Sequence, residues 1–229
     1  MRFPNLSLEN ILWDKGFSIV AGADEVGRGS FAGPVVSAVV AFSKSINQLV
    51  NNSNSPRIDD SKKLTTKQRE IADKWIKENS IAWGIGVGSV TLINHAGIVK
   101  ATNFAFRSAI KLMTKSLDRR IDYLLIDAFY IPYIGGIRRS KQKPIIRGDE
   151  KSVSIASAAI LAKVYRDNLM IALNKKCQKY LWDKNKGYGT KEHRDAILKY
   201  GVTKYHRKAF VLCTWVETWF LKRSPPHRT

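Results

Sequence analysis

The sequence predicts an α/β fold in which a mixed sheet is flanked by helices and followed by a C-terminal helical segment. Apolar, β-branched runs at residues 19–26, 35–42 and 81–90 predict three successive strands of an antiparallel meander. A long helical pattern and two shorter apolar runs, at residues 121–126 and 144–147, come next. A chain that reads as strands, then one helix and further strands, then helices, is typical of a mixed sheet covered by helices.

Local patterns also assign the elements between the first strands. Residues 5–17 carry apolar side chains at helical spacing, which predicts a short helix. Residues 43–57 end in NNSNSPR and predict a polar loop. Thr65 and Gln68 form the pattern of a capping box, so a helix is expected to begin there.

Helices dominate the second half of the chain. One is expected over residues 91–116 and another, rich in small residues, over 153–170. A basic, aromatic segment follows, and residues 205–220 predict a last helix whose Trp215 and Trp219 lie one turn apart. The face expected against the sheet in the first of these helices consists of Ile98, Thr102, Ala105, Ala109 and Leu112.

The charge of the chain points to an anionic partner. Its 229 residues contain 39 Lys+Arg against 19 Asp+Glu, a formal net charge of +20, and the sequence pI is about 10.1. Nucleic acid is the expected partner, because contacts with phosphates release counterions. A generic basic surface, as in a protein held to ribosomes or to anionic lipid, is the alternative.

Cysteine usage and hydropathy predict a cytoplasmic protein with no membrane partner. Cys177 and Cys213 have no CxxC spacing, so neither a zinc site nor a disulfide framework is expected. The start of the chain shows no apolar region followed by a cleavage site. No apolar run is long enough to span a bilayer.

Three aspartates share one feature, which is their position at or just after a predicted strand. Asp24, Asp127 and Asp149 would meet if those strand ends are neighbours in the sheet. Clustered carboxylates repel one another and normally hold cations, and their hard oxygen ligands favour Mg²⁺ or Mn²⁺. Turn caps or solvated charges are the alternative. Glu25 can join Asp24 only if the strand ends or twists there, because neighbouring side chains face opposite sides of a strand.

The segment GRGSFAG, which begins at Gly27, has two interpretations. A dinucleotide-binding loop would need a helix to follow, with its N-terminus under the pyrophosphate. Pro34 and the run VVSAVVAF favour a strand instead. The other interpretation is a close approach of the backbone to a ligand, in which the glycines give access and Arg28 reaches a phosphate.

These residues carry a resemblance to a known family. The chain resembles ribonuclease HII, the type 2 ribonuclease H, from about residue 19 to residue 210. The resemblance rests on ADEVGRGSFAGPVV, DDSKKLT, the Ile126-Asp127 strand end, RGDEKSVSIASAAILAKVYRD, NKGYGTKEH and HRKAF.

The resemblance implies a ribonuclease H-like fold with a five-stranded mixed sheet of order 3-2-1-4-5. Residues 1–172 would form the catalytic core, and residues 173–229 a helical segment that contributes to substrate binding. The implied substrates are RNA/DNA hybrids and duplex DNA with single embedded ribonucleotides, cut on the 5′ side of the ribonucleotide to leave 3′-hydroxyl and 5′-phosphate ends. We expect a monomer that uses Mg²⁺ or Mn²⁺.

The family motifs assign roles to particular residues. The metal-binding, catalytic quartet would be Asp24, Glu25, Asp127 and Asp149. Gly27, Arg28 and Gly29 would contact the ribose 2′-hydroxyl and the flanking phosphate, and Tyr188 would lie on the sugar at the RNA–DNA junction. The 2′-hydroxyl is the group that distinguishes RNA from DNA.

Further side chains are candidates on chemistry alone. Lys62, Lys63 and Lys163 are expected to contact phosphates, with a solvated lysine as the alternative for each. His193 and His206 could transfer protons, although metal-activated water would not require a histidine.

The chain departs from the family at a few positions. Ala128 follows Asp127 where bacterial members often have glycine, Gly97 stands where asparagine is usual, and Val26 where alanine is common. The type 3 relative carries threonine in place of Arg28 and an extra N-terminal domain, so type 2 is favoured. A binding module without catalysis, or a transposase-like or integrase-like nuclease, would not need this set of motifs.

Overall fold

The computed structural model describes residues 3–50, 52 and 55–211. The predicted last helix, over residues 205–220, and the tryptophans assigned to it lie largely or wholly outside these ranges.

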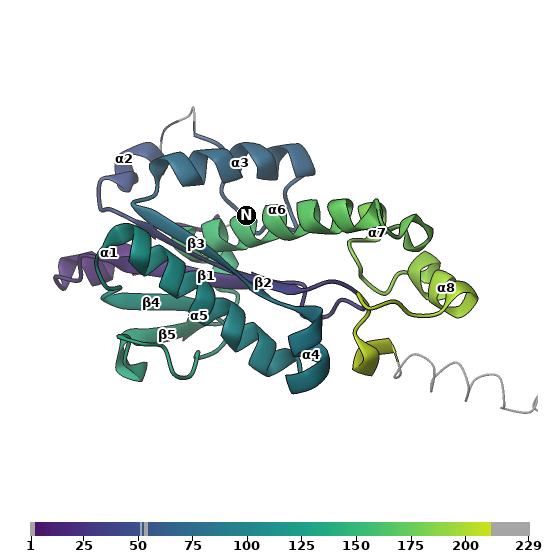
Figure 1. The fold of residues 1–229 in the computed structure, drawn as a ribbon. Helices are drawn as coiled ribbons and strands as arrows, with labels where there is room; N and C mark the ends of the chain where they lie inside the picture. Colours follow the sequence, from purple (N-terminus) through teal and green to yellow (C-terminus); the bar gives the residue numbers. More distant parts are fainter. Residues whose placement is uncertain (1–2, 51, 53–54, 212–229) are drawn as a thin grey trace, which may run out of the picture.

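One five-stranded sheet, of order β3-β2-β1-β4-β5, forms the centre of the molecule (Figure 1). The first three strands are antiparallel neighbours, β1 (Val20–Val26), β2 (Val35–Phe42) and β3 (Ala82–Gly88). Two parallel strands, β4 (Tyr123–Asp127) and β5 (Gln142–Ile145), extend the sheet beyond β1. The predicted meander and strand order are confirmed, and β5 begins two residues earlier than the sequence predicted.

The register of the two central strands determines which side chains meet. Ala23 of β1 pairs with Ile126 of β4, so the next residues, Asp24 and Asp127, are neighbours on adjacent strands. Every residue of β2 is buried, which explains why its sequence is apolar except for Ser37.

Two long helices cover opposite faces of the sheet (Figure 1). α5 (Ile98–Leu117) lies so close to β3 that a Cβ added at Gly86 would fall 1.9 Å from the backbone oxygen of Ala105. On the other face, a Cβ at Gly22 would fall 2.2 Å from a backbone carbon of α6 (Val153–Asn174). The glycines in these strands are therefore required by close helix packing.

The single helix predicted over residues 91–116 is wrong. The structure has α4 (Val90–Ala96) and α5, separated at Gly97, whose φ of 85° is unfavourable for other residues. The predicted inward face is also corrected, because Leu112 is 54% exposed while Met113 is buried.

The remaining elements are short helices. α2 lies inside the segment predicted as a loop, and the capping box at the start of α3 is confirmed. Their bounds are α1 (Ser7–Asp14), α2 (Ile46–Val50), α3 (Thr66–Asn79), α7 (Trp182–Asn185), α8 (Lys191–Tyr200), and the 3₁₀ turns η1 (Arg139–Lys141), η2 (Gly148–Glu150) and η3 (Gln178–Tyr180).

The segment after α6 builds a small core of its own. Tyr180, Trp182 and Ile197 are buried together with Ala32, from the loop after β1, and Met170, from the end of α6. This second core attaches the C-terminal segment to the loop between β1 and β2. Within the described ranges, no helix is both long and apolar enough to cross a membrane.

Candidate active site

The expected carboxylates come from three different elements. Asp24 lies within β1, two residues before the strand ends, and not at the strand end that the sequence predicted. Asp127 is the last residue of β4, and Asp149 lies in η2, between β5 and α6. We call Asp24, Glu25, Asp127 and Asp149 the carboxylate cluster.

Electrostatics shows that the cluster is gathered in one place. Burial, followed by the charges of Glu25, Asp127 and Asp149, raises the pKa of Asp24 well above its usual range. The Asp24 side chain is buried, and its Oδ1 accepts a hydrogen bond of 2.6 Å from the backbone N–H of Glu25. Charges confined in this way repel unless a cation neutralises them.

Glu25 reaches the same site from the other side of β1. Burial, together with the charge of Asp127, raises the pKa of Glu25 to about 7 against the opposing charge of Arg28. Because Asp127 raises the pKa of both Asp24 and Glu25, it lies near both side chains. The strand therefore need not end at Asp24 for adjacent residues to share one site.

A backbone N–H group and a lysine amine contact the other two carboxylates of the cluster, Asp127 and Asp149. The backbone N–H of Gly148 donates to Asp127 Oδ1 over 2.7 Å. Burial raises the pKa of Asp149, and Lys62 opposes the shift, with its Nζ 3.5 Å from Asp149 Oδ2. Asp60, expected from sequence only as a turn residue, is buried and lies 3.6 Å from the same Lys62 amine.

The cluster offers the donors that a hard divalent cation requires. Glu25 Oε2 is buried and accepts no hydrogen bond. In the part of the chain that the structure describes, no three or more His, Cys, Asp or Glu side chains stand in an arrangement that could hold a metal ion. Buried, mutually repelling carboxylate oxygens nevertheless fit Mg²⁺ or Mn²⁺ by their chemistry.

The N-terminal segment fixes the chain directly after Asp149. Glu9 of α1 is fully buried, and its Oε1 accepts from the hydroxyls of Ser152 and Ser154, each over 2.6 Å. Ser152 is the N-cap of α6. The sequence signal for this contact was a charged residue between Leu8 and Leu12 on an apolar helix face.

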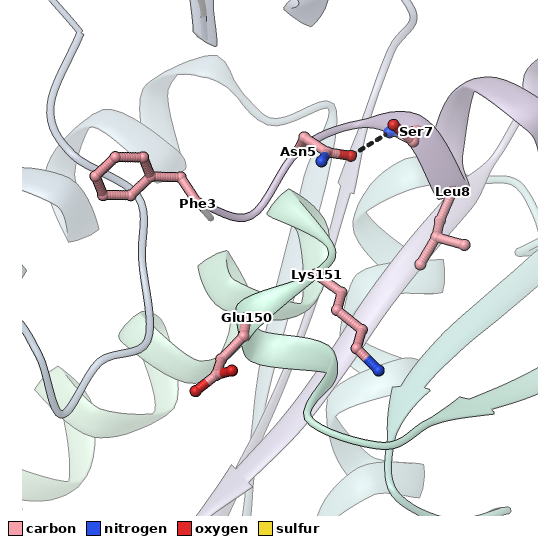
Figure 2. A pocket seen from close by; sticks show the side chains of 6 residues that line it. All are labelled: Phe3, Asn5, Ser7, Leu8, Glu150 and Lys151. Carbon is pink, nitrogen blue, oxygen red and sulfur yellow. Dashed lines mark hydrogen bonds between the residues drawn. The ribbon is translucent and has the colours of Figure 1, made fainter. Parts of the chain in front are cut away.

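A pocket of about 330 Å³ lies beside this junction. Figure 2 shows the N-terminal segment passing the turn that carries Glu150 and Lys151, with the Asn5 side chain bonded to the Ser7 N–H. The lining residues are Phe3, Asn5, Ser7, Leu8, Glu150 and Lys151.

Two buried arginines hold the loop after β1, residues 27–34, which we call the glycine loop. Arg166 of α6 is fully buried and donates to the carbonyls of Pro34 and Ala32 and to the hydroxyl of Ser30. Arg207 is also fully buried and donates to the carbonyls of Gly33 and Arg28. Sequence reasoning missed both arginines.

The two glycines of the GRG motif differ in their surroundings. Gly27 has a φ of 88°, and a Cβ there would fall 2.1 Å from Arg166 Nε. Gly29 has open space where its Cβ would be. Between them, Arg28 lies over the ring of Phe129, and its Nη1 is 3.6 Å from Glu25 Oε1.

Tyr188 lies beside the glycine loop although it is distant in sequence. The carbonyl of Gly187 accepts from the backbone N–H groups of Phe31 and Ala32, over 2.8 and 3.1 Å. The Arg166 guanidinium carbon is 5.3 Å from the centroid of the Tyr188 ring. The structure thus brings the GRG and GYGT motifs together.

The candidate lysines lie around the site in different environments. Lys62 is exposed next to Asp149, and Lys63 pairs with Glu150 over 3.3 Å. Lys163 pairs with Asp167 over 2.8 Å and lies 5.9 Å from the centroid of the Tyr188 ring.

The two candidate histidines lie in the second core. His193 and His206 are buried, and each ring nitrogen lies within hydrogen-bonding distance of a polar group of the C-terminal segment. Their contacts do not support the proton-transfer role considered from the sequence.

Comparison with solved structures places the fold. The chain is similar to the ribonuclease H2 of Pyrococcus horikoshii OT3, with a TM-score of 0.65 over 90% of this chain and 100% of that one, at 21% identity. It is also similar to Bst-RNase HIII in complex with Mn²⁺, with a TM-score of 0.70 over 90% of this chain and 71% of that one, at 17% identity. The fold is that of the ribonuclease H class of hydrolases.

Sequence comparison identifies the family. The model of the family described as Ribonuclease HII matches residues 21–218. A Ribonuclease HII of Clostridioides difficile (strain 630) is 44% identical over 203 residues, which cover 89% of this chain and 74% of the relative. The chain belongs to the ribonuclease HII family and is an endoribonuclease that acts on RNA/DNA hybrids.

Proposed function

We propose that this ribonuclease also incises duplex DNA on the 5′ side of a single embedded ribonucleotide, and that its products carry 3′-hydroxyl and 5′-phosphate ends. The observation that carries the proposal is the pair of hydrogen bonds between the glycine loop and Gly187, the residue before Tyr188, beside the carboxylate cluster. Groups suited to contact a 2′-hydroxyl and groups suited to hold a cation would then act on the same nucleotide.

The carboxylate cluster is proposed to hold Mg²⁺ or Mn²⁺. Bound there, divalent cations would supply an activated water and stabilise the leaving oxygen. The buried, unpartnered Glu25 Oε2 and the raised pKa of Asp24 support this assignment. A phosphate could not approach the uncompensated cluster, since like charges at short range repel strongly. The solved Bst-RNase HIII, which has the same fold, contains Mn²⁺.

The remaining site residues are proposed to position the nucleic acid. Arg28, between Gly27 and Gly29, would contact the phosphate flanking the ribonucleotide, and Tyr188 would lie on the sugar. The open space at Gly29 is compatible with a close approach of substrate to the backbone.

Basic groups outside the glycine loop would follow the nucleic-acid backbone. Lys62, Lys63 and Lys163 would contact phosphates, with Lys62 exchanging Asp149 for substrate. The C-terminal segment would contribute to binding because it carries Tyr188. A cytoplasmic monomer is the state that we expect to act.

Mapping the cut tests the proposal. A duplex with one ribonucleotide is incubated with the protein and Mn²⁺, and the cut is located on a sequencing gel. The expected result is a single cut 5′ of the ribonucleotide, which EDTA and Asp127→Asn each abolish while duplex binding is retained. Cleavage elsewhere, or full activity of Asp127→Asn, would contradict the proposal.

A further inference from the structure

A pair of buried histidines joins α8 to the chain that follows it. His193 of α8 is fully buried, and His206, after α8, is 1% exposed. Their Nε2 atoms are 3.3 Å apart. Two imidazoles that face each other through the same kind of nitrogen can form a hydrogen bond only if one nitrogen carries a proton and the other does not.

The neighbours of His206 fix its tautomer. The backbone N–H of Thr203 donates to His206 Nδ1 over 2.9 Å. A nitrogen that accepts a hydrogen bond carries no proton, so the proton of neutral His206 lies on Nε2 and points at His193.

The neighbours of His193 fix the opposite tautomer. Its Nε2 accepts from Trp182 Nε1 over 3.1 Å, in addition to the bond from His206. The proton of neutral His193 therefore lies on Nδ1, which donates to the backbone carbonyl of Tyr188 over 2.9 Å. A directed chain of hydrogen bonds thus runs from Thr203 to Tyr188.

We infer that His193 is a positioning residue that holds the Tyr188 backbone, and through it the Tyr188 ring, against the glycine loop, and that His206 acts by fixing the tautomer in which His193 donates to Tyr188. The chain of bonds fixes Tyr188 from one side, while the carbonyl of Gly187 is held from the other by Phe31 and Ala32. This inference rests on the proposed role of Tyr188 at the ribonucleotide.

The hydrogen bonds of this histidine pair can form in the stated directions only while both rings are neutral. A proton on His193 Nε2 would place a donor against the donors of Trp182 and His206. Burial lowers the pKa of both histidines, which agrees with neutral rings at physiological pH.

Two substitutions at His193 separate its two contacts. In His193→Asn the amide nitrogen stands where Nδ1 was and can still donate to the Tyr188 carbonyl, while the acceptor for Trp182 and His206 is lost. In His193→Gln the amide oxygen can reach the Nε2 position and accept from both, while the donor to Tyr188 is lost. The asparagine variant is therefore the matched control for the glutamine variant.

The experiment measures the preference for a single embedded ribonucleotide over a long RNA/DNA hybrid, as the ratio of kcat/KM values with Mn²⁺. Tyr188→Ala and His193→Gln should each lower the ratio about tenfold. His193→Asn should stay within about twofold of wild type. In the Tyr188→Ala background, His193→Gln should change the ratio less than about twofold, because residues that act as a unit are not additive.

The outcomes separate the inference from the proposed function. If Tyr188→Ala keeps the wild-type ratio, the role of Tyr188 fails and the positioning role fails with it. If Tyr188→Ala lowers the ratio but His193→Gln does not, only the positioning role is overturned. Nitrogen NMR of the wild-type protein decides if a variant does not fold: Nδ1–H on His193 and Nε2–H on His206 support the inference, and any other protonation state overturns it.

Discussion

The two sides of the candidate site are built on opposite principles. The carboxylate cluster confines like charges, which raise the pKa of Asp24. The glycine loop is held by Arg166 and Arg207, whose hydrogen bonds fix its backbone between Arg28 and Pro34. One side consists of repelling carboxylates that a bound cation would neutralise, whereas the backbone of the other is already held by hydrogen bonds.

This difference between the two sides agrees with the role proposed for each of them. Cation-assisted cleavage benefits from carboxylates that gain stability only when the ions bind, whereas selection of one sugar requires a rigid surface. Stability and function are therefore expected to oppose each other in the carboxylate cluster and to change together in the glycine loop.

The largest effect is expected from Arg166→Met. The variant leaves the carbonyls of Ala32 and Pro34 without the donor that they have in the wild type, so the free energy of unfolding should fall by about 4 kcal/mol. Arg194→Met is the control, since that exposed arginine also donates to one carbonyl, that of Gly189. Urea unfolding should show little change for the control. Equal losses for the two variants would contradict the account.

Protonation should affect the carboxylate cluster and the histidine pair with opposite signs. The pKa of Glu25 is raised from 4.5 to about 7, so its contribution to stability is present below pH 4.5 and is lost as the pH rises through 7. The pKa of His206 is lowered from 6.5 to about 4, first by burial and then by His193, so its contribution is present above pH 6.5 and is lost as the pH falls through 4.

Glu25→Gln should expose the histidine contribution. In EDTA, acidification from pH 7 to pH 4 should stabilise wild type through Glu25 and destabilise it through His206. The variant keeps the His206 loss without the Glu25 gain, so over this interval its stability should fall by about 3 kcal/mol relative to wild type, which corresponds to the shift of the Glu25 pKa from 4.5 to about 7. Denaturant unfolding at each pH measures this difference, and parallel profiles for variant and wild type would show that Glu25 makes no such contribution.

The glycine loop allows a comparison of the two glycines that flank Arg28. Gly27→Ala should cost about 2–3 kcal/mol, because an alanine with this φ is strained and its Cβ would collide with Arg166. Gly29→Ala should change stability by less than about 0.5 kcal/mol, since nothing occupies that space. Thermal unfolding of both variants is the measurement, and a reversed order would refute the close contact with Arg166.

The smallest effect is expected next to Asp127. Ala128 has a φ of 64°, a conformation that glycine adopts without strain. Ala128→Gly should raise the free energy of unfolding by roughly 0.5 kcal/mol. This residue is one of the departures from the family noted in the sequence. Any loss of stability in urea unfolding would show that the backbone there is not strained.

The sequence predicted the sheet because its signals are local or carried by motifs. The apolar runs marked β1 to β4, and Thr65 with Gln68 marked the start of α3. The break at Gly97 was missed, because a glycine within a helical pattern does not reveal whether its φ is positive. The exposed side of Leu112 was missed for a related reason, since small residues lie on more than one face of α5.

The carboxylates could be predicted from their type and position, whereas the groups that hold the glycine loop could not. Arg166 and Arg207 bind carbonyls that lie 132 and 174 residues away in sequence. A charged residue is normally expected on the surface, so only the fold reveals its burial. Glu9 was missed in the same way, since the serine hydroxyls that it accepts from lie 143 and 145 residues along the chain.

The most direct test of the account is the stabilisation of the protein by Mn²⁺. Ligands that bind only the folded state stabilise it by about 2.7 kcal/mol at a concentration 100 times Kd. The melting temperature of wild type should therefore rise when EDTA is replaced by Mn²⁺, while Asp24→Asn should melt higher than wild type in EDTA and gain much less from Mn²⁺. Equal gains for the two proteins, or no gain for wild type, would contradict the claim that the carboxylate cluster is built for cations.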